Sequence, residues 1–196
     1  MIVADRVRLP LSFDVDALAC EATWLPAEAW VPHFNRDIYE GDWSGVPLRS
    51  VRGVATQLYP DPAAPVPYAD TEILASCPAH RAALAQFGCP VTSARLLALA
   101  PGATIREHRD YRLGWHDGEV RIHVPIITDD RAEFVLDGLP VDLATGEAWY
   151  LDLTCLHRAA NNSTERRVHL VVDCVVDEWL TMLMDRAICL APQGVQ

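Results

Sequence analysis

Three residues in this sequence have the types and the spacing that bind a transition metal. His108 and Asp110 lie two apart in ATIREHRDYRLGWH, residues 103–116, and residues two apart on a strand or at its end point to the same side. His157 follows in a later segment with strand character on both sides. Two histidines and one carboxylate leave three metal positions open, as in the facial triad of non-haem Fe(II) oxygenases, which need them for a co-substrate and O₂. The alternative interpretation of His108–Asp110 is a charged surface turn.

The other histidines are weaker candidates. His33 and His80 fall in the half of the chain that reads as helical and irregular. His116 is followed directly by Asp117, and adjacent residues on a strand point to opposite sides. The six cysteines are scattered with no C-x-x-C pair, so zinc-ribbon spacing is absent and reduced thiols are expected.

Short strands are expected to position the metal-ligand candidates. After residue 90 the chain consists of β-branched and aromatic segments separated by turns such as Pro101-Gly102 and Asp137-Gly138. This pattern predicts a mainly β fold with flanking α-helices, a sandwich, jelly roll or barrel. Strands are predicted over residues 93–100, 119–128, 132–138, 139–144, 147–153 and 166–176.

We expect a single domain over residues 1–196, with its core at 91–176. Residues 1–90 are predicted to be a helical and irregular part that packs on this core. Within it, Asp14 is a candidate N-cap, and a helix over 71–88 is interrupted by Pro78. A C-terminal helix is predicted over 177–190.

Two of the predicted strands carry an arginine and a histidine on one face. In VRIHVPI these are Arg121 and His123, and in RVHLVVD they are Arg167 and His169. For either strand alone, the favoured interpretation is a half-exposed sheet with a polar outer face. The alternative is that both faces line a polar cavity between two sheets.

Two further side chains could contribute to such a cavity. Arg95 could hold a substrate carboxylate there, although an exposed strand arginine is the more common case. Trp149 could form a substrate wall, although an aromatic residue of the sandwich core is the more common case. Asp152 is read as a structural hydrogen-bond acceptor.

Charge and hydropathy narrow the partners. The net charge is −11, which repels phosphate backbones and anionic lipid headgroups, so neither nucleic acid nor membrane is expected as a partner. No apolar run has the length of a membrane span or a signal peptide, and a cytoplasmic location is expected. A small-molecule substrate is favoured, and the surface is compatible with a monomer or a homodimer.

The segments PGATIREHRD, RIHVPIIT and GEAWYLDLTCLHRAANNSTERRVHLVVD together resemble the core of the aspartyl/asparaginyl β-hydroxylase family. The similarity covers residues 93–174 in order and spacing, and IYEGDWSGVPLRS resembles the segment that precedes the core in bacterial members. This family belongs to the Fe(II)- and 2-oxoglutarate-dependent dioxygenases and includes bacterial hydroxylases of free amino acids such as proline. The resemblance implies a double-stranded β-helix, a cupin-like jelly roll with iron between its sheets.

The resemblance also assigns roles. His108, Asp110 and His157 would be the iron ligands; some members lack the carboxylate, but here Asp110 is present. Arg167 matches the arginine that pairs with the far carboxylate of 2-oxoglutarate, a task for which its planar fork is suited. Arg121 and His123 match the family's R-x-H strand, whose side chains reach the co-substrate or the substrate. We expect His123 to bind the co-substrate and Arg121 to bind the substrate, with Arg95 and Trp149, raised above from the residues alone, as further substrate contacts.

The implied activity is hydroxylation of a C–H bond of a free amino acid, proline or related, or of a small peptide. Fe(II), 2-oxoglutarate and O₂ would be consumed together, with release of succinate and CO₂. Two rivals remain open: a cupin-type metalloenzyme that does not use 2-oxoglutarate, and a non-catalytic β-sandwich that binds a small molecule.

Overall fold

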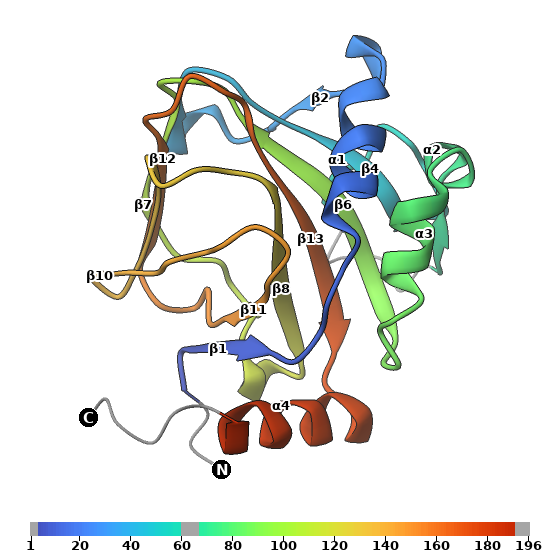
Figure 1. The fold of residues 1–196 in the computed structure, drawn as a ribbon, viewed down its shortest axis with the longest axis vertical. Coiled ribbons are helices and arrows are strands. Elements are labelled where there is room, and N and C mark those ends of the chain that lie inside the picture. The colour runs from blue at the N-terminus through green and yellow to red at the C-terminus, as the bar shows by residue number, and fades with distance from the viewer. Residues whose placement is uncertain (1–3, 60–66, 191–196) are drawn as a thin grey trace.

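Two antiparallel sheets face each other in the computed structural model, which describes residues 4–59 and 67–190 (Figure 1). The larger sheet contains, in spatial order, β1 (Arg6–Leu9), β11 (Ala148–Leu151), β8 (Glu119–Ile127), β13 (Arg167–Val175), β6 (Val91–Leu99), β4 (Trp43–Val51) and β2 (Val31–Pro32), with β5 (Tyr68–Asp70) beside β4. The smaller sheet contains β10 (Leu139–Pro140), β9 (Ala132–Leu136), β12 (His157–Asn161), β7 (Thr104–His108) and β3 (Tyr39–Glu40). This arrangement confirms the predicted mainly β fold with flanking helices.

Three helices lie on the outer side of the larger sheet, and a fourth lies at one end of the fold near β1 (Figure 1). They are α1 (Val15–Trp24), α2 (Glu72–Ala75), α3 (Pro78–Leu84) and α4 (Glu178–Leu190). The Asp14 carboxylate caps α1 by accepting from the N–H of Ala17. Pro78 separates α2 from α3 because proline lacks an N–H for a helix interior but fits the first turn, where α3 begins.

Along the central strands of the larger sheet, successive side chains point alternately to its two faces, which have different surroundings. On the helix-covered face, side chains such as Val120, Ile122 and Leu170 are fully buried in one apolar core. Burying each such side chain contributes about 1.5–3 kcal/mol. The opposite face looks toward the smaller sheet and carries the polar side chains of the same strands.

Those polar side chains are buried. Arg95, Arg121 and His169 are at most 6% exposed, although each belongs to a type that usually faces water. The favoured interpretation of a half-exposed sheet is therefore wrong, and the alternative of polar faces between two sheets is confirmed. A second apolar core, including Trp43, lies around these groups at the inner face.

The first 90 residues contribute more sheet than the sequence predicted. The segment WSGVPLRSV lies in the part predicted to be helical and irregular, and it contains Gly45 and Pro47, residues that strands disfavour. It forms β4, paired with β6 over most of its length, and the register shifts between Pro47 and Arg49. The proline is tolerated at this irregularity, where it costs no regular ladder hydrogen bond.

Two other strand predictions also need correction. Residues 104–108 and 157–161 form β7 and β12, although neither short segment was predicted as a strand. The strand predicted over 139–144 is only two residues long, β10. Asp137 and Gly138 both have positive φ, 48° and 75°, as expected of a tight Asp-Gly turn between β9 and β10.

A candidate metal centre between the sheets

The two histidines of the predicted triad lie side by side on neighbouring strands of the smaller sheet. His108 ends β7 and His157 begins β12, and the antiparallel register pairs them with ring centroids 4.2 Å apart. Asp110 follows β7 by two residues and is held there by its N–H, which donates to the carbonyl of Leu153 at 2.9 Å. One ligand atom from each of the three side chains lies within 4.8 Å of the others. The sequence-predicted set is therefore brought together.

Backbone carbonyls fix the tautomer of both histidines. Nδ1 of His108 bonds the carbonyl of Arg106 at 2.8 Å, and Nδ1 of His157 bonds the carbonyl of Cys155 at 3.0 Å. A carbonyl only accepts, so each Nδ1 carries a proton, and Nε2 is the ring nitrogen left for a metal. Hydrogen bonding of the second ring nitrogen in this way is the usual support of metal-ligating histidines.

Electrostatics favour the neutral form of His157. Burial is the main cause, and it lowers the pKa of this imidazole. A neutral imidazole is the form that binds a metal, so His157 is ready to act as a ligand without losing a proton. The donor set of two imidazole nitrogens and one carboxylate oxygen fits Fe(II).

Arg167 lies on the inner face of β13 and has no acidic partner in the described part of the chain. The NH2 group of Arg167 lies 3.4 Å from Nδ1 of His169. Burial lowers the pKa of Arg167 to about 10, so the guanidinium is still charged at neutral pH. A partly buried cation without a counter-charge is costly unless an anion arrives, so this residue fits the carboxylate of a bound acid.

His123 lies next to this arginine on the inner face. Its Nδ1 is 3.4 Å from Nδ1 of His169, and burial lowers the pKa of both imidazoles well below the usual value. The Nε2 atoms of His123 and His169 are buried, and neither has a hydrogen-bond partner among the described residues. Unsatisfied buried polar atoms indicate a site for a polar ligand. The position of His123 thus suits its predicted contact with a co-substrate.

Arg121 and Arg95, both predicted to contact substrate, are bound to protein carboxylates instead. Arg121 donates to Asp173 through Nε and NH2 and to Asp110 through NH1. Arg95 donates to Asp173 and Ser93, and it is fully buried rather than on the surface. The sequence analysis did not single out Asp173, which these two arginines share.

Trp149 pairs with His123 in the β11–β8 register and is partly buried. Its indole N–H donates to Glu147 at 2.9 Å. The position is compatible with either predicted role, a wall of the site or part of the core. Asp152 is the structural acceptor that the sequence predicted, since it bonds the backbone N–H and the hydroxyl of Thr154.

An aromatic cluster near the metal-ligand candidates was missed by the sequence analysis. It consists of His33, Phe34, Tyr39, Trp43 and Tyr59. His33 stacks on Trp43 with centroids 3.6 Å apart and on Phe34 at 4.9 Å, with Tyr39 and Tyr59 edge-on. Burial lowers the pKa of His33 to about 4, and the charges of Arg95, Asp110 and His108 also act on it. The cluster is therefore close enough to the candidate metal centre to sense its charge.

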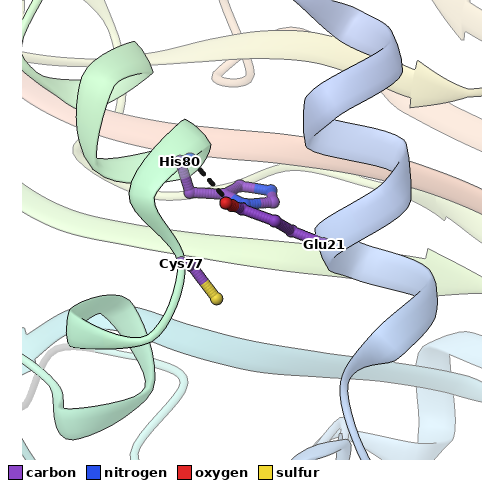
Figure 2. A group of neighbouring side chains, drawn as sticks. All are labelled: Glu21, Cys77 and His80. Carbon is purple, nitrogen blue, oxygen red and sulfur yellow. Dashed lines mark hydrogen bonds and ion pairs between the residues drawn. The ribbon is translucent and has the colours of Figure 1, made fainter.

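A second group with metal-binding residue types lies between α1 and α3, far from the sheets' inner faces. Figure 2 shows Glu21 against the ring of His80, with Cys77 beside them. Both carboxylate oxygens are already bonded, because Glu21 accepts from the N–H groups of Ala79 and His80 and from Nδ1 of His80 at 2.7 Å. The arrangement is that of a helix cap. No cluster in the described residues includes His116.

Structural comparison finds a similar fold in proteins of known structure. An oxidoreductase of the 2OG-Fe(II) oxygenase family from Burkholderia pseudomallei aligns with a TM-score of 0.55 at 14% identity, covering 87% of this chain and 85% of that one. The α-ketoglutarate-dependent epimerase SnoN from nogalamycin biosynthesis aligns with a TM-score of 0.52 at 13% identity, covering 98% and 85%. A Pseudomonas putida prolyl-4-hydroxylase aligns with a TM-score of 0.50 at 16% identity, covering 88% and 93%. At these identities the likeness establishes the fold, a double-stranded β-helix.

The fold and the His-Asp-His site define a 2-oxoglutarate/Fe(II) oxygenase-like hydroxylase. The family described as Aspartyl/Asparaginyl beta-hydroxylase matches residues 19–176, most of the chain, and this protein belongs to that family. Family and site together imply Fe(II) and 2-oxoglutarate. Among the described helices, none combines the length and apolarity that crossing a membrane requires.

Proposed function

We propose that this protein hydroxylates a C–H bond of a free amino acid, proline or a related one, or of a short peptide. Fe(II) would be held by Nε2 of His108, a carboxylate oxygen of Asp110 and Nε2 of His157. The observation that carries the proposal is the combination of this triad with Arg167 on the facing sheet, a partly buried cation that has no acidic partner among the described residues. Bound Fe(II) and 2-oxoglutarate supply the oxidising power, with O₂ consumed and succinate and CO₂ released.

The protein's own contribution is positioning and exclusion of water. Arg167 would hold the distal carboxylate of 2-oxoglutarate by two parallel hydrogen bonds, which replaces the missing counter-charge. His123 and His169 would use their free Nε2 atoms to bond the same molecule or its neighbour. Both imidazoles are neutral at physiological pH, so they add no charge that would oppose Arg167.

The aromatic cluster supports a small substrate. His33 and Tyr59 come from the N-terminal half of the chain and lie in the electrostatic reach of Asp110. An apolar wall beside the reacting position would exclude water and pack against a short aliphatic or ring-shaped side chain. We further propose that the enzyme acts in the cytoplasm on a small molecule without nucleic-acid or membrane partners, as a monomer or homodimer.

The test is succinate formation by the protein reconstituted anaerobically with Fe(II), then supplied with 2-oxoglutarate, O₂ and each free amino acid in turn. We expect one amino acid or a small group to stimulate succinate release, and His108→Ala to abolish it. Slow release that no amino acid stimulates would move the substrate to peptides. Absence of iron binding and of succinate would exclude the hydroxylase.

The cupin-type alternative makes a different prediction. A metalloenzyme that does not use 2-oxoglutarate would bind the metal, release no succinate and tolerate the loss of Arg167. The non-catalytic alternative predicts that His108→Ala and Asp110→Ala leave ligand binding intact. Arg167, without an acidic partner among the described residues, favours the proposal, because 2-oxoglutarate brings it a carboxylate and neither alternative requires an acid there.

A further inference from the structure

Tyr59 has a buried hydroxyl with no hydrogen-bond partner among residues 4–59 and 67–190. The residue as a whole is only partly buried, so the hydroxyl points into the protein while another part of the residue reaches the surface. A phenol can donate one hydrogen bond, and leaving it unpaired away from water is unfavourable. This hydroxyl is therefore a candidate contact for a bound molecule.

The ring of Tyr59 is held in place by its neighbours. It lies against the guanidinium of Arg95, whose Cζ is 5.0 Å from the ring centroid. Arg95 is itself fully buried on the inner face of β6 and donates to Asp173. The ring is also edge-on to His33 at 4.8 Å and to Phe34 at 5.1 Å. A cation–π contact and two edge contacts fix the direction of the hydroxyl before a ligand binds.

The position of Tyr59 is separate from that of Arg167. In the β6–β13 ladder, Arg95 pairs with the residue four positions after Arg167. Four residues along a strand span about 13 Å, at about 3.3 Å per residue. The charge of Asp110, by contrast, acts on the Tyr59 phenol. The phenol therefore lies toward the candidate metal centre and apart from the position proposed for the distal carboxylate of 2-oxoglutarate.

The surroundings of the hydroxyl favour an anionic partner. Burial raises the pKa of Tyr59 to about 12, so the phenol keeps its proton at neutral pH and can donate it in a hydrogen bond. The positive charges of Arg95 and Arg121 act on it more strongly than the negative charges of Asp110 and Asp173. A donor in positive surroundings attracts an anion and disfavours an ammonium group. In an amino acid, that anion is the carboxylate.

We propose that the hydroxyl of Tyr59 donates a hydrogen bond to the carboxylate of the substrate and so determines specificity. The inference rests on the proposed function and narrows it. The substrate would need a free carboxylate beside the reacting carbon atoms, as in a free amino acid or the C-terminal residue of a peptide. An internal peptide residue has an amide at that place. A site that hydrogen-bonds a polar group strongly rejects analogues that lack it.

The experiment measures substrate binding without turnover. Wild type and Tyr59→Phe, loaded anaerobically with Fe(II) and 2-oxoglutarate, are titrated by calorimetry with two probes. These are the free amino acid that most stimulates succinate release by wild type and its α-carboxamide. We expect Tyr59→Phe to weaken binding of the acid about 10- to 100-fold, the range for a hydrogen bond to a charged group. Binding of the carboxamide should weaken about threefold or less, because the bond lost there is between neutral groups.

Tyr150→Phe is the matched control. Tyr150 also has a buried hydroxyl without a partner among the described residues, but it lies in the apolar core on the helix-covered face of the larger sheet. Removing the same atom there should change binding of the acid less than about twofold. Phenylalanine at position 59 keeps the ring against Arg95, and circular dichroism and urea unfolding check the fold of both variants. The KM for 2-oxoglutarate is measured in parallel and should change less than about threefold.

The outcomes separate this proposal from the proposed function. Folded Tyr59→Phe that binds the acid with wild-type affinity overturns the contact and leaves the hydroxylase intact. Equal weakening for acid and carboxamide, or for Tyr59→Phe and Tyr150→Phe, overturns it as well, and so does an increase confined to the KM for 2-oxoglutarate. Wild type that binds the carboxamide as tightly as the acid overturns the contact whether or not the variant folds. If no free amino acid stimulates wild type or binds to it, the amino-acid substrate of the proposed function is itself refuted.

Discussion

Two groups of metal-binding residue types occur in this protein, and only one is built to hold a metal. His108, Asp110 and His157 lie at strand ends between two sheets, whereas Glu21, Cys77 and His80 lie between two helices. Both groups bring a histidine and a carboxylate close together. The difference is the group that accepts the hydrogen bond from Nδ1 of each histidine.

In the sheet site, Nδ1 of each histidine donates to a backbone carbonyl, which leaves Nε2 for a cation. In the helix site, Nδ1 of His80 donates to the carboxylate that would have to be a ligand. The remaining capacity of Glu21 is taken by the N–H groups at the start of α3. Residue type and proximity alone are thus poor guides to a metal centre, and the partners of the second nitrogen are better ones.

The largest expected effect comes from removing a histidine from each group. His157→Ala should lower Co²⁺ or Fe²⁺ affinity more than 100-fold and abolish succinate formation, because two ligands cannot hold the metal. His80→Ala should leave metal binding and turnover unchanged, although the protein becomes less stable. Isothermal titration with Co²⁺ on both variants checks the pair. Comparable metal loss in His80→Ala would mean that the helix group is a site.

The next largest effect is expected at Arg167. Arg167→Ala should raise the KM for 2-oxoglutarate 10- to 100-fold, since a charge-assisted bidentate hydrogen bond contributes about 1.5–3 kcal/mol. Metal affinity should be nearly unchanged, because Arg167 is not a ligand.

Its neighbour Arg166 provides the control, as its guanidinium instead lies 3.8 Å from the ring centroid of Trp30 and bonds Ser44. Arg166→Ala should change the KM less than threefold. A similar increase in both variants would show that positive charge in general, rather than Arg167, binds the co-substrate.

The contrast between the two groups also shows what the sequence could predict. His108 and Asp110 could be predicted as ligands because H-x-D spacing at a strand end fixes the relative direction of the two side chains. The distal histidine, His157, followed from its place between strand-like segments, and Arg167 followed from the resemblance in order and spacing. Strand alternation placed Asp173 on the inner face with Arg167, but its partnership with Arg121 depends on which strands are neighbours and in what register.

The fold was predicted best where each strand has a clear apolar alternation, as in β6, β8 and β13. It was predicted worst at β4, whose glycine and proline are tolerated only because β6 supplies a partner. The aromatic cluster depended on the same long-range pairing. His33 follows the edge strand β2, which reaches the site because it pairs with β4. No short-range sequence pattern predicts that His33 lies near the site.

A smaller effect is expected from Glu21. Glu21→Ala should lower the free energy of unfolding by about 2 kcal/mol, because three donors around the start of α3 lose their acceptor. Burial raises the pKa of this carboxyl, but the bonds from Ala79 and His80 outweigh it and lower the pKa below the ordinary 4.5. A lowered folded-state pKa means that this stabilisation is present above pH 4.5 and is lost as the pH falls through the folded value.

Urea unfolding of wild type and Glu21→Ala at pH 7 and near pH 3 measures this contribution. The difference between the two proteins should shrink at the lower pH, where the wild-type carboxyl becomes protonated. A difference that stays constant would show that Glu21 acts through packing rather than through its charge.

The smallest effect is expected from Cys77, the third member of the helix group. Its thiol is buried at 2% exposure, and burial raises its pKa, so the neutral thiol predominates at pH 7. A metal ligand would need the thiolate, and no cation compensates this thiol in the described structure. Cys77→Ala should therefore change unfolding free energy by about 1 kcal/mol, the contribution of one small buried group. The Cd²⁺–thiolate absorption band near the ultraviolet edge should not increase on titration of the His108→Ala/His157→Ala protein. An increase that Cys77→Ala removes would overturn the contrast, because the capped helix group would then hold a soft metal.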